Sequence, residues 1–366
     1  MALDLDLRTP IAYGWNVFEE LNLHVPEGKA MLVLGRGSAR ALDLESRVRK
    51  VLRREIDVFQ GVEPNPSVRT VMEGSETIRV SDPKFILAVG GGSVIDAAKF
   101  MAVLARHGGE VMDYITGRLT PPDAGYPVYA VPTTPGTSSE ITPFSIVTVP
   151  EERNKLGLRH PSIYPAKAIV DPELTVSLPR DQTASTGFDI LSHAMESYWS
   201  RNANPLSRQL CLNSVRLIRK HLKNAYEDGA SRPDREGVSL ASIFAGLSFS
   251  NTGTTICHAI SYPITVDTGL PHGMACALSL GPTFELLVEK GADGMEELAE
   301  CFGSSQDSFR EDLIEMMRSM NVPTDLDAIG FKGGAERIMS TNISGFQRNF
   351  TLDINSDDVR RIIEDM

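Results

Sequence analysis

The sequence is poor in cysteine, and its cysteines are widely spaced. Only four occur among 366 residues, and no two form a Cys-x-x-Cys pair. This scarcity argues against a disulfide scaffold and indicates reduced thiols, as in a cytoplasmic protein. Cys257 and Cys276 lie near the candidate site described below, and we interpret both as small buried residues.

Long apolar runs and excess positive charge are also missing. No apolar run reaches the roughly 18 residues of a membrane-spanning helix. The opening segment MALDLDLRTP lacks the basic start and apolar core of a secretory signal. The net charge of −12 disfavours nucleic-acid binding, because a phosphate backbone would be repelled. We therefore expect a cytoplasmic protein that acts on a small molecule and binds neither nucleic acid nor membrane.

The composition that remains is that of a two-domain globular protein. A chain of 366 residues can bury two cores, and 42% hydrophobic with 23% charged residues is ordinary for a soluble chain. Residues 1–180 alternate short apolar runs with helical patterns, which predicts an α/β domain with a mostly parallel sheet. Residues 181–366 carry helical spacing, which predicts an all-helical domain. The predicted strands span residues 29–35, 55–62, 84–93 and 127–134.

Two strand-to-loop junctions are candidate cofactor sites. Gly90, Gly91 and Gly92 stand between a strand and a helix, and Ser93 can cap that helix. Backbone N–H groups at a helix start suit a pyrophosphate, although a plain tight turn is the alternative. The segment PTTPGTSSE, residues 132–140, clusters hydroxyls at the strand end where ligands of open α/β sheets bind. A solvated Ser/Thr loop is the alternative for this segment.

A third strand-to-loop junction, residues 35–40 after the first predicted strand, bears on the choice between NAD(H) and NADP(H). NAD sites commonly place an acidic residue near the adenosine ribose, whereas here no carboxylate occurs between Gly35 and Asp43. Arginine binds phosphate as a bidentate fork, so the junction predicts NADP(H) over NAD(H). The alternative is that the arginines merely lie on the surface. The residues concerned are Gly35, Arg36, Gly37, Ser38 and Arg40.

Four residues of the second half form a candidate metal site. Asp189 and His193 are four residues apart in a helical pattern, so their side chains leave the same face one turn apart. His258 and His272 are fourteen residues apart and flank a Pro/Gly-containing segment. One carboxylate and three imidazoles suit a first-row divalent metal. The alternative is a capping aspartate with ordinary polar histidines. Because domain interfaces favour ligand sites, we expect metal and dinucleotide to meet in a cleft.

Five motifs in order along the chain resemble the iron-dependent (group III) alcohol dehydrogenase family. They are GGGSVIDAAK, PTTPGTSSEIT, AIVDPELTVSLP, TGFDILSHAMESY and CHAISYP with GLPHG, and the resemblance covers nearly the whole chain. It implies a Rossmann-like N-terminal domain with a helical C-terminal domain, the dehydroquinate synthase-like fold. It also implies a homodimer that uses iron(II) or zinc, with Asp189, His193, His258 and His272 as the metal ligands.

The same resemblance assigns the cofactor contacts. Residues 90–93 and Asp96 match the pyrophosphate loop, and residues 35–38 resemble the version found in NADPH-using members. Thr133, Thr134 and Thr137 match the segment that lines the nicotinamide pocket. Lys155 stands where the family often has a cofactor-contacting lysine.

Tyr262 is a departure from the family pattern. Many members carry a further histidine there, thought to help move the proton, and a phenol with a pKa of about 10 is a poorer acid–base group. We count Tyr262 with the four ligands as catalytic candidates; water, the cofactor ribose hydroxyls or a threonine are the alternative proton routes. The segment HAISYPIT is most similar to the branch of the family that contains phosphonoacetaldehyde reductases. That substrate needs a cationic pocket, for which Arg159, His160 and Arg348 are candidates.

We therefore predict reversible hydride transfer between NADP(H) and a small primary alcohol or aldehyde, with the metal as Lewis acid. A metal-dependent hydrolase, a dehydroquinate-synthase-like lyase and a dinucleotide-binding regulatory module are the alternatives. Residues that accept a hydrogen bond from a metal-bound histidine orient its ring in such sites. Glu196 is one candidate for that role, but we expect a solvated helix glutamate instead.

Overall fold

The computed structural model describes residues 6–121, 125–149, 154–341 and 343–366. The chain separates into two compact units, Leu7–Thr175 and Val176–Met366. Asp6 belongs to the second unit, where its amide donates a hydrogen bond of 2.7 Å to Asn251 Oδ1. None of the helices in the described ranges combines the length and hydropathy needed to cross a bilayer.

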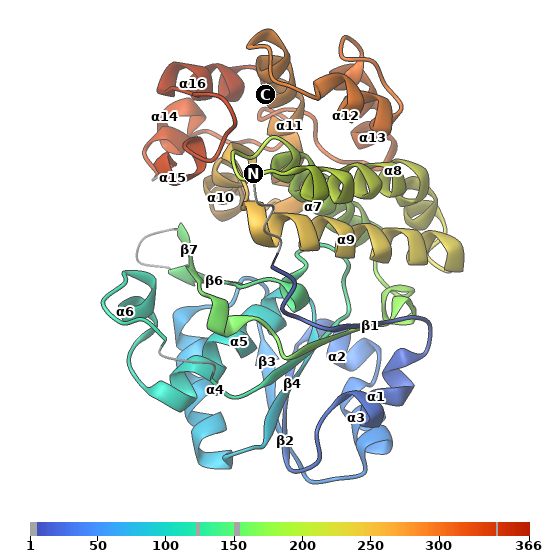
Figure 1. Ribbon diagram of the computed structural model, residues 1–366, viewed down its shortest axis with the longest axis vertical. Helices are drawn as coiled ribbons and strands as arrows, with labels where there is room; N and C mark the ends of the chain where they lie inside the picture. The colour runs from blue at the N-terminus through green and yellow to red at the C-terminus, as the bar shows by residue number, and fades with distance from the viewer. Residues whose placement is uncertain (1–5, 122–124, 150–153, 342) are drawn as a thin grey trace. The chain divides into compact units, whose positions relative to one another are not determined.

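The unit Leu7–Thr175 is built on a parallel sheet of six strands in the order β1-β8-β5-β4-β2-β3. Figure 1 labels β1, β2, β3 and β4 of this sheet. An antiparallel pair, β6 with β7, lies outside this sheet. The strands are β1 (Ile11–Tyr13), β2 (Ala30–Gly35), β3 (Ile56–Val62), β4 (Phe85–Gly90), β5 (Val128–Pro132), β6 (Phe144–Val149), β7 (Asn154–Arg159) and β8 (Lys167–Val170). The four strands predicted from the sequence correspond to β2, β3, β4 and β5.

Helices cover both faces of the sheet because successive strand residues point to opposite faces. In β2, Met31 and Val33 join a core with residues of α4 and α5, whereas Leu32 and Leu34 join a core with residues of α1 and α3. The helices are η1 (Val17–Glu20), α1 (Leu21–His24), α2 (Gly37–Ala41), α3 (Leu44–Leu52), α4 (Val68–Ser81), α5 (Gly92–His107), α6 (Val111–Ile115), η2 (Ser139–Ile141), η4 (Pro161–Ile163) and η5 (Pro172–Thr175).

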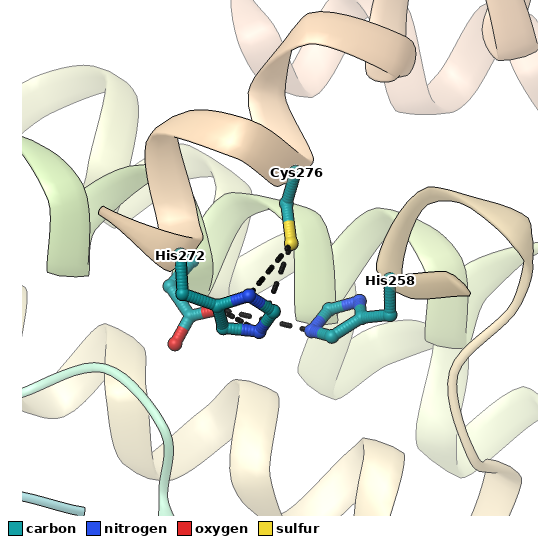
Figure 2. Close-up of side chains that lie close together, drawn as sticks. His258, His272 and Cys276 are labelled. Carbon is teal, nitrogen blue, oxygen red and sulfur yellow. Dashed lines mark hydrogen bonds and ion pairs between the residues drawn. The ribbon is translucent and has the colours of Figure 1, made fainter. Parts of the chain in front are cut away.

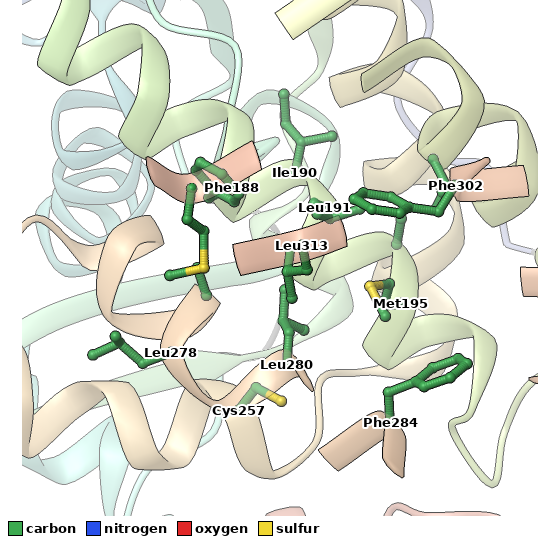
Figure 3. Close-up of a cluster of buried hydrophobic side chains, with 14 of the residues drawn as sticks. Phe188, Ile190, Leu191, Met195, Cys257, Leu278, Leu280, Phe284, Phe302 and Leu313 are labelled. Atoms are coloured by element: carbon green, nitrogen blue, oxygen red, sulfur yellow. The ribbon is translucent and has the colours of Figure 1, made fainter. Parts of the chain in front are cut away.

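The unit Val176–Met366 is helical, and its described residues contain only one isolated bridge, Ser200–Phe350, outside the helices and loops. Its core is a single apolar cluster to which α7, α11 and α13 contribute side chains such as Phe188, Leu280 and Leu313 (Figure 3). The helices are α7 (Arg180–Tyr198), α8 (Pro205–Glu227), α9 (Arg232–Thr252), α10 (Ile256–Thr268), α11 (His272–Glu289), α12 (Met295–Phe302), α13 (Phe309–Ser319), α14 (Gly334–Met339), α15 (Ser344–Gln347) and α16 (Ser356–Glu364).

One glycine sets the crossing of α11 and α7. A Cβ added at Gly273 would stand 1.8 Å from the Ser185 carbonyl oxygen and 2.7 Å from the Asp189 amide nitrogen. Because both atoms are backbone, no side-chain rotation could relieve the clash. Gly273 therefore lets the start of α11 approach the middle of α7, and this brings His272 beside Asp189.

Candidate metal centre

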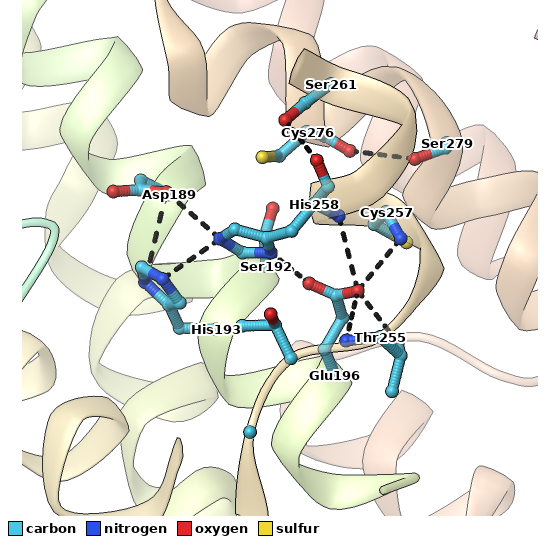
Figure 4. A network of polar contacts seen from close by, with 12 residues as sticks. Asp189, Ser192, His193, Glu196, Thr255, Cys257, His258, Ser261, Cys276 and Ser279 are labelled. Carbon is cyan, nitrogen blue, oxygen red and sulfur yellow. Dashed lines mark hydrogen bonds and ion pairs between the residues drawn. The ribbon is translucent and has the colours of Figure 1, made fainter. Parts of the chain in front are cut away.

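Three helices supply the residues predicted to bind a metal. Asp189 and His193 lie one turn apart on α7, His258 is in the first turn of α10, and His272 is the first residue of α11. Figure 4 shows Asp189, His193 and His258 turned toward one another. Asp189, His193 and His258 are buried, whereas the side chain of His272 keeps 25% of its surface exposed. His272 is therefore the most solvent-accessible of the four side chains.

Asp189 Oδ1 lies at the centre of this group. It is 3.9 Å from His193 Nδ1, 3.7 Å from His258 Nε2 and 3.8 Å from His272 Nε2. Within the described part of the chain this buried oxygen accepts no hydrogen bond. Leaving a buried carboxylate oxygen unsatisfied is costly, and two atoms each about 2.1 Å from one cation lie about 3–4 Å apart. The arrangement therefore fits a divalent cation.

Glu196 corrects the sequence prediction of a solvated glutamate. It is fully buried on α7, seven residues after Asp189, and its Oε2 pairs with His258 Nδ1. Because a carboxylate only accepts, the proton lies on Nδ1 and the lone pair of His258 lies on Nε2, toward Asp189. Glu196 is thus the partner that orients a metal-binding histidine.

The other oxygen of Glu196 caps α10. Oε1 accepts hydrogen bonds from the amides of Thr255 and Cys257, at 2.9 and 2.8 Å, and from the Thr255 hydroxyl at 2.7 Å. These amides belong to the helix start, whose N–H groups have no partner inside the helix and favour negative charge. One side chain therefore fixes both the start of α10 and the imidazole that α10 carries.

The remaining two imidazoles are also held in place. Ser261 Oγ donates to the His258 carbonyl at 2.7 Å and lies 3.2 Å from His272 Nδ1, so it accepts from that nitrogen. This leaves the His272 lone pair on Nε2, facing Asp189. The ring of His193 stacks on Phe249, with centroids 4.0 Å apart, and its Nε2 lies 2.9 Å from His258 Nε2.

The charges of the site compensate for its burial. Burial lowers the pKa of His258, but the Glu196 and Asp189 carboxylates outweigh this and raise it to about 9. Burial likewise raises the pKa of Asp189, yet the neighbouring His193, His258 and His272 hold it below its usual range. The pocket thus stabilises positive charge, which a bound cation supplies in place of protons.

Cys276 enters the same group, which the sequence analysis did not predict. Ligand atoms of Asp189, His258, His272 and Cys276 all lie within 4.8 Å of one another. Cys276 is buried, as predicted, and burial raises the pKa of its thiol well above the usual range. The spacing His-x-x-x-Cys from residue 272 places both side chains on one helix face and could have indicated this position.

Tyr262 lies beside the group, on the second turn of α10. Its ring stacks on His272 with centroids 5.7 Å apart, and Phe346 meets it edge to face at 6.1 Å. These rings form an apolar wall next to the partly exposed His272. The role of Tyr262 in catalysis stays a prediction.

Two loops of the unit Leu7–Thr175 carry the predicted pyrophosphate glycines and the predicted nicotinamide threonines. A Cβ on Gly91 would stand 3.1 Å from Thr134 Oγ1, and one on Gly92 would stand 2.2 Å from Thr137 Oγ1. The Thr133 amide donates to the Gly90 carbonyl at 2.9 Å. The glycines therefore let the start of α5 pack directly on the threonine loop, at the carboxyl ends of β4 and β5.

Ser93 and Asp96, both predicted to belong to the pyrophosphate loop, make contacts within the protein. Ser93 was predicted to cap α5, but the cap position is Gly91, and Ser93 Oγ accepts from the Asn65 amide at 3.1 Å. The capping prediction is therefore wrong. Asp96 is buried, accepts from the Ile146 amide at 3.1 Å and pairs with Lys99 at 3.4 Å, so it fastens α5 to β6.

The arginine-bearing junction follows β2. Gly35 ends that strand, Arg36 is exposed and donates to the Gly61 carbonyl at 2.9 Å, and Arg40 is exposed in α2. Gly37 begins α2; the side chain of Ser38 lies outside the described part of the structure. Lys155 is buried on β7, opposite Thr148 on β6.

Family models match both units of the chain. Residues 9–172 match the model "Iron-containing alcohol dehydrogenase", and residues 183–365 match "Fe-containing alcohol dehydrogenase family, C-terminal". A similar characterised protein is the NADPH-dependent butanol dehydrogenase of Clostridium saccharobutylicum. It is 32% identical over 376 residues, covering 98% of this chain and 96% of that protein.

Solved structures agree with these matches. A sulfoacetaldehyde reductase from Bifidobacterium kashiwanohense, in complex with NAD+, superposes with a TM-score of 0.87 at 28% identity and covers 100% of this chain and 98% of that one. An iron-containing alcohol dehydrogenase from Thermotoga maritima gives a TM-score of 0.84 at 29% identity, covering 99% and 98%.

Proposed function

Because the chain belongs to the iron-containing alcohol dehydrogenase family and is an oxidoreductase, we propose that it interconverts a small primary alcohol and its aldehyde with NADP(H) and a divalent metal. Membership also confirms the predicted dehydroquinate synthase-like fold, an α/β unit followed by a helical one. Iron(II) or zinc would be held by Asp189, His193, His258 and His272.

One observation carries the metal assignment. Asp189 Oδ1 is buried, accepts no hydrogen bond among the described residues, and lies 3.7–3.9 Å from three imidazole nitrogens. No direct hydrogen bond spans these distances, whereas one cation bound by all four groups does.

The residues of the site have different roles in the proposed reaction. When bound, the cation supplies Lewis acidity to the substrate oxygen and the nicotinamide exchanges hydride. Glu196 keeps the lone pair of His258 directed at the site, and Ser261 does the same for His272. The Tyr262 ring shields the His272 side, so that an alkyl chain meets an apolar surface there. Tyr262 is also a candidate proton donor, with water, the cofactor ribose hydroxyls and a threonine as alternatives.

The preference for NADP(H) rests on the junction after β2. Arg36 and Arg40 are both exposed there, and no carboxylate occurs between Gly35 and Asp43. A guanidinium binds a 2′-phosphate as a bidentate ion pair, whereas a free hydroxyl carries no charge that would pair with it. Arg40→Ala should therefore raise the KM for NADPH while leaving the KM for NADH nearly unchanged; equal changes would contradict the assignment.

The deciding experiment is an aldehyde panel assayed with NADPH and NADH after loading with iron(II) or zinc. We expect metal-dependent NADPH oxidation with short aliphatic aldehydes. Absence of turnover with every aldehyde in a protein shown to hold one metal per chain would overturn the proposal. Metal-dependent hydrolysis without NADPH oxidation would favour a hydrolase, and elimination from a phosphorylated substrate would favour a lyase.

An anionic aldehyde is a second candidate substrate, because a similar solved structure is a sulfoacetaldehyde reductase. Phosphonoacetaldehyde, the substrate suggested by the sequence, carries a comparable tetrahedral anion. In the helical unit, Arg348 is exposed two residues after Phe346, which contacts Tyr262. In the other unit, Arg159 stacks over Phe144 and His160 accepts from the Ser162 amide. Arg348→Ala should raise the KM for phosphonoacetaldehyde at least tenfold and leave that for butyraldehyde unchanged.

We also propose that the protein is a cytoplasmic homodimer. Light scattering of the purified full chain tests the oligomeric state, and a monomer at micromolar concentration would contradict it.

A further inference from the structure

Cys276 is an additional potential donor at the metal centre, and the function proposed above gives it no role. It follows His272 by one turn of α11, so both side chains leave the same helix face. Its sulfur lies 3.9 Å from Nδ1 and 3.8 Å from Nε2 of His272 and points toward the group (Figure 2). The thiol is fully buried, so bulk solvent does not compete for it.

The spacing suits a shared cation. A cation about 2.1 Å from a nitrogen and about 2.3 Å from a sulfur holds these atoms about 3.6 Å apart at a tetrahedral angle. The observed separation of Cys276 Sγ and His272 Nε2 is 3.8 Å. The ligand atoms of Asp189, His258, His272 and Cys276 form one set, no two of them more than 4.8 Å apart.

A second observation points to a ligand in the same space. Asp189 is 3% exposed, and its Oδ1 accepts no hydrogen bond within the described ranges of the chain. This oxygen faces the space that the Cys276 sulfur borders, since both belong to the set just defined. A buried carboxylate oxygen with no hydrogen-bond donor among the described residues favours a positive charge in this space.

We propose that the Cys276 thiolate is a direct ligand of the active-site cation. This inference rests on the proposed function, because it requires a cation at Asp189. The donors are then one carboxylate, one thiolate and imidazoles, a softer set than oxygen and nitrogen alone, which favours zinc over manganese or magnesium. Only the thiolate binds metal, so binding forms the metal–sulfur bond and releases the thiol proton to solvent.

X-ray absorption at the zinc edge of the zinc-loaded full-length protein tests this directly. We expect a sulfur shell at about 2.3 Å beside nitrogen and oxygen ligands at about 2.0–2.2 Å. The cobalt(II)-loaded protein should show a sulfur-to-cobalt charge-transfer band in the near ultraviolet. Cys276→Ser should lose both features and bind zinc at least tenfold more weakly. Cys211→Ser should keep them, because Cys211 is buried elsewhere and contacts Ser248 Oγ at 3.1 Å.

The outcomes of these experiments distinguish the proposal for Cys276 from the proposed metal-dependent function. One zinc per wild-type chain with only nitrogen and oxygen neighbours would overturn the role of Cys276 and leave the proposed function intact. No stoichiometric metal in the wild-type protein would overturn both. Because the wild-type spectrum alone decides, a folding defect in Cys276→Ser would not rescue the proposal.

Discussion

Glu196 uses its two oxygens for two different tasks at the metal centre. Oε1 accepts from the amides at the start of α10, while Oε2 pairs with His258 Nδ1. An amide at this position can still accept through its oxygen, so the helix start stays capped. It cannot supply the negative charge that makes the imidazole a stronger donor. The structure therefore separates the electrostatic role of Glu196 from its capping role.

Glu196→Gln should weaken zinc binding by about 10- to 100-fold with little change in secondary structure. Chelator competition measures the affinity, and circular dichroism checks the fold. Glu297→Gln is the matched control, because Glu297 accepts from the Tyr198 hydroxyl in the same unit, away from the metal centre. Equal zinc affinity in the wild type and Glu196→Gln would show that the His258 contact does not support the metal.

Glu140 is the residue from which we expect a pH effect on stability. Burial raises its pKa to about 7, and of the other charged groups around it Lys99 opposes the shift while Asp96 adds to it. A carboxyl with a raised pKa in the folded state stabilises the fold below its unfolded pKa of about 4.5, and that contribution is lost as the pH rises through 7. Glu140→Gln should therefore be more stable than the wild type at pH 8, by on the order of 3 kcal/mol, and similar to it at pH 5.

Urea unfolding of the wild type and Glu140→Gln at both pH values measures this difference. Glu27→Gln is the control, because the Glu27 side chain is 93% exposed. A stability gap between wild type and Glu140→Gln that did not grow between pH 5 and pH 8 would refute the assignment.

At the scale of helices, the crossing of α7 and α11 determines the geometry of the metal site. A Cβ at Gly273 would meet backbone atoms of α7, whereas one at Gly281, on the same helix, would meet Arg310 Cγ at 2.9 Å. The Arg310 side chain can move, but the α7 backbone cannot. Gly273→Ala should therefore push α11 away from α7 and lower zinc affinity at least 100-fold, while Gly281→Ala should retain it.

Isothermal titration of both glycine variants with zinc provides the measurement. Full zinc affinity in a folded Gly273→Ala protein would mean that the contact does not position His272.

The sequence predicted those elements whose own residues carry a clear apolar pattern. The strands β2, β4 and β5 are apolar runs, and β4 leads into glycines, so each was found from the sequence. Strand β1 has three residues, and its partner β8 follows more than 150 residues later, so neither segment carries a sufficient pattern alone. Glu196 was misjudged for the same reason: only the tertiary fold brings the start of α10 onto it.

At the scale of the molecule, metal and dinucleotide are expected to stabilise different units. The proposed ligands all lie in Val176–Met366, whereas the glycine and threonine loops lie in Leu7–Thr175. A ligand that binds only the folded state stabilises it by about 2.7 kcal/mol at one hundred times its dissociation constant. Hydrogen exchange can locate this stabilisation, because amides are protected where the structure opens less often.

Removing the metal with a chelator should increase exchange in α7, α10 and the first turns of α11, where the ligands lie. The cores built on the parallel sheet should be affected much less, because no proposed metal ligand lies in them. Adding NADPH to the metal-free protein should instead protect the start of α5 and the loop after β5. If metal removal loosened β4 and β5 as much as α10, the metal would not be held by the helical unit, and the ligand assignment would fail. Exchange at the Thr255 and Cys257 amides is the most direct local report, because Glu196 links both of them to His258.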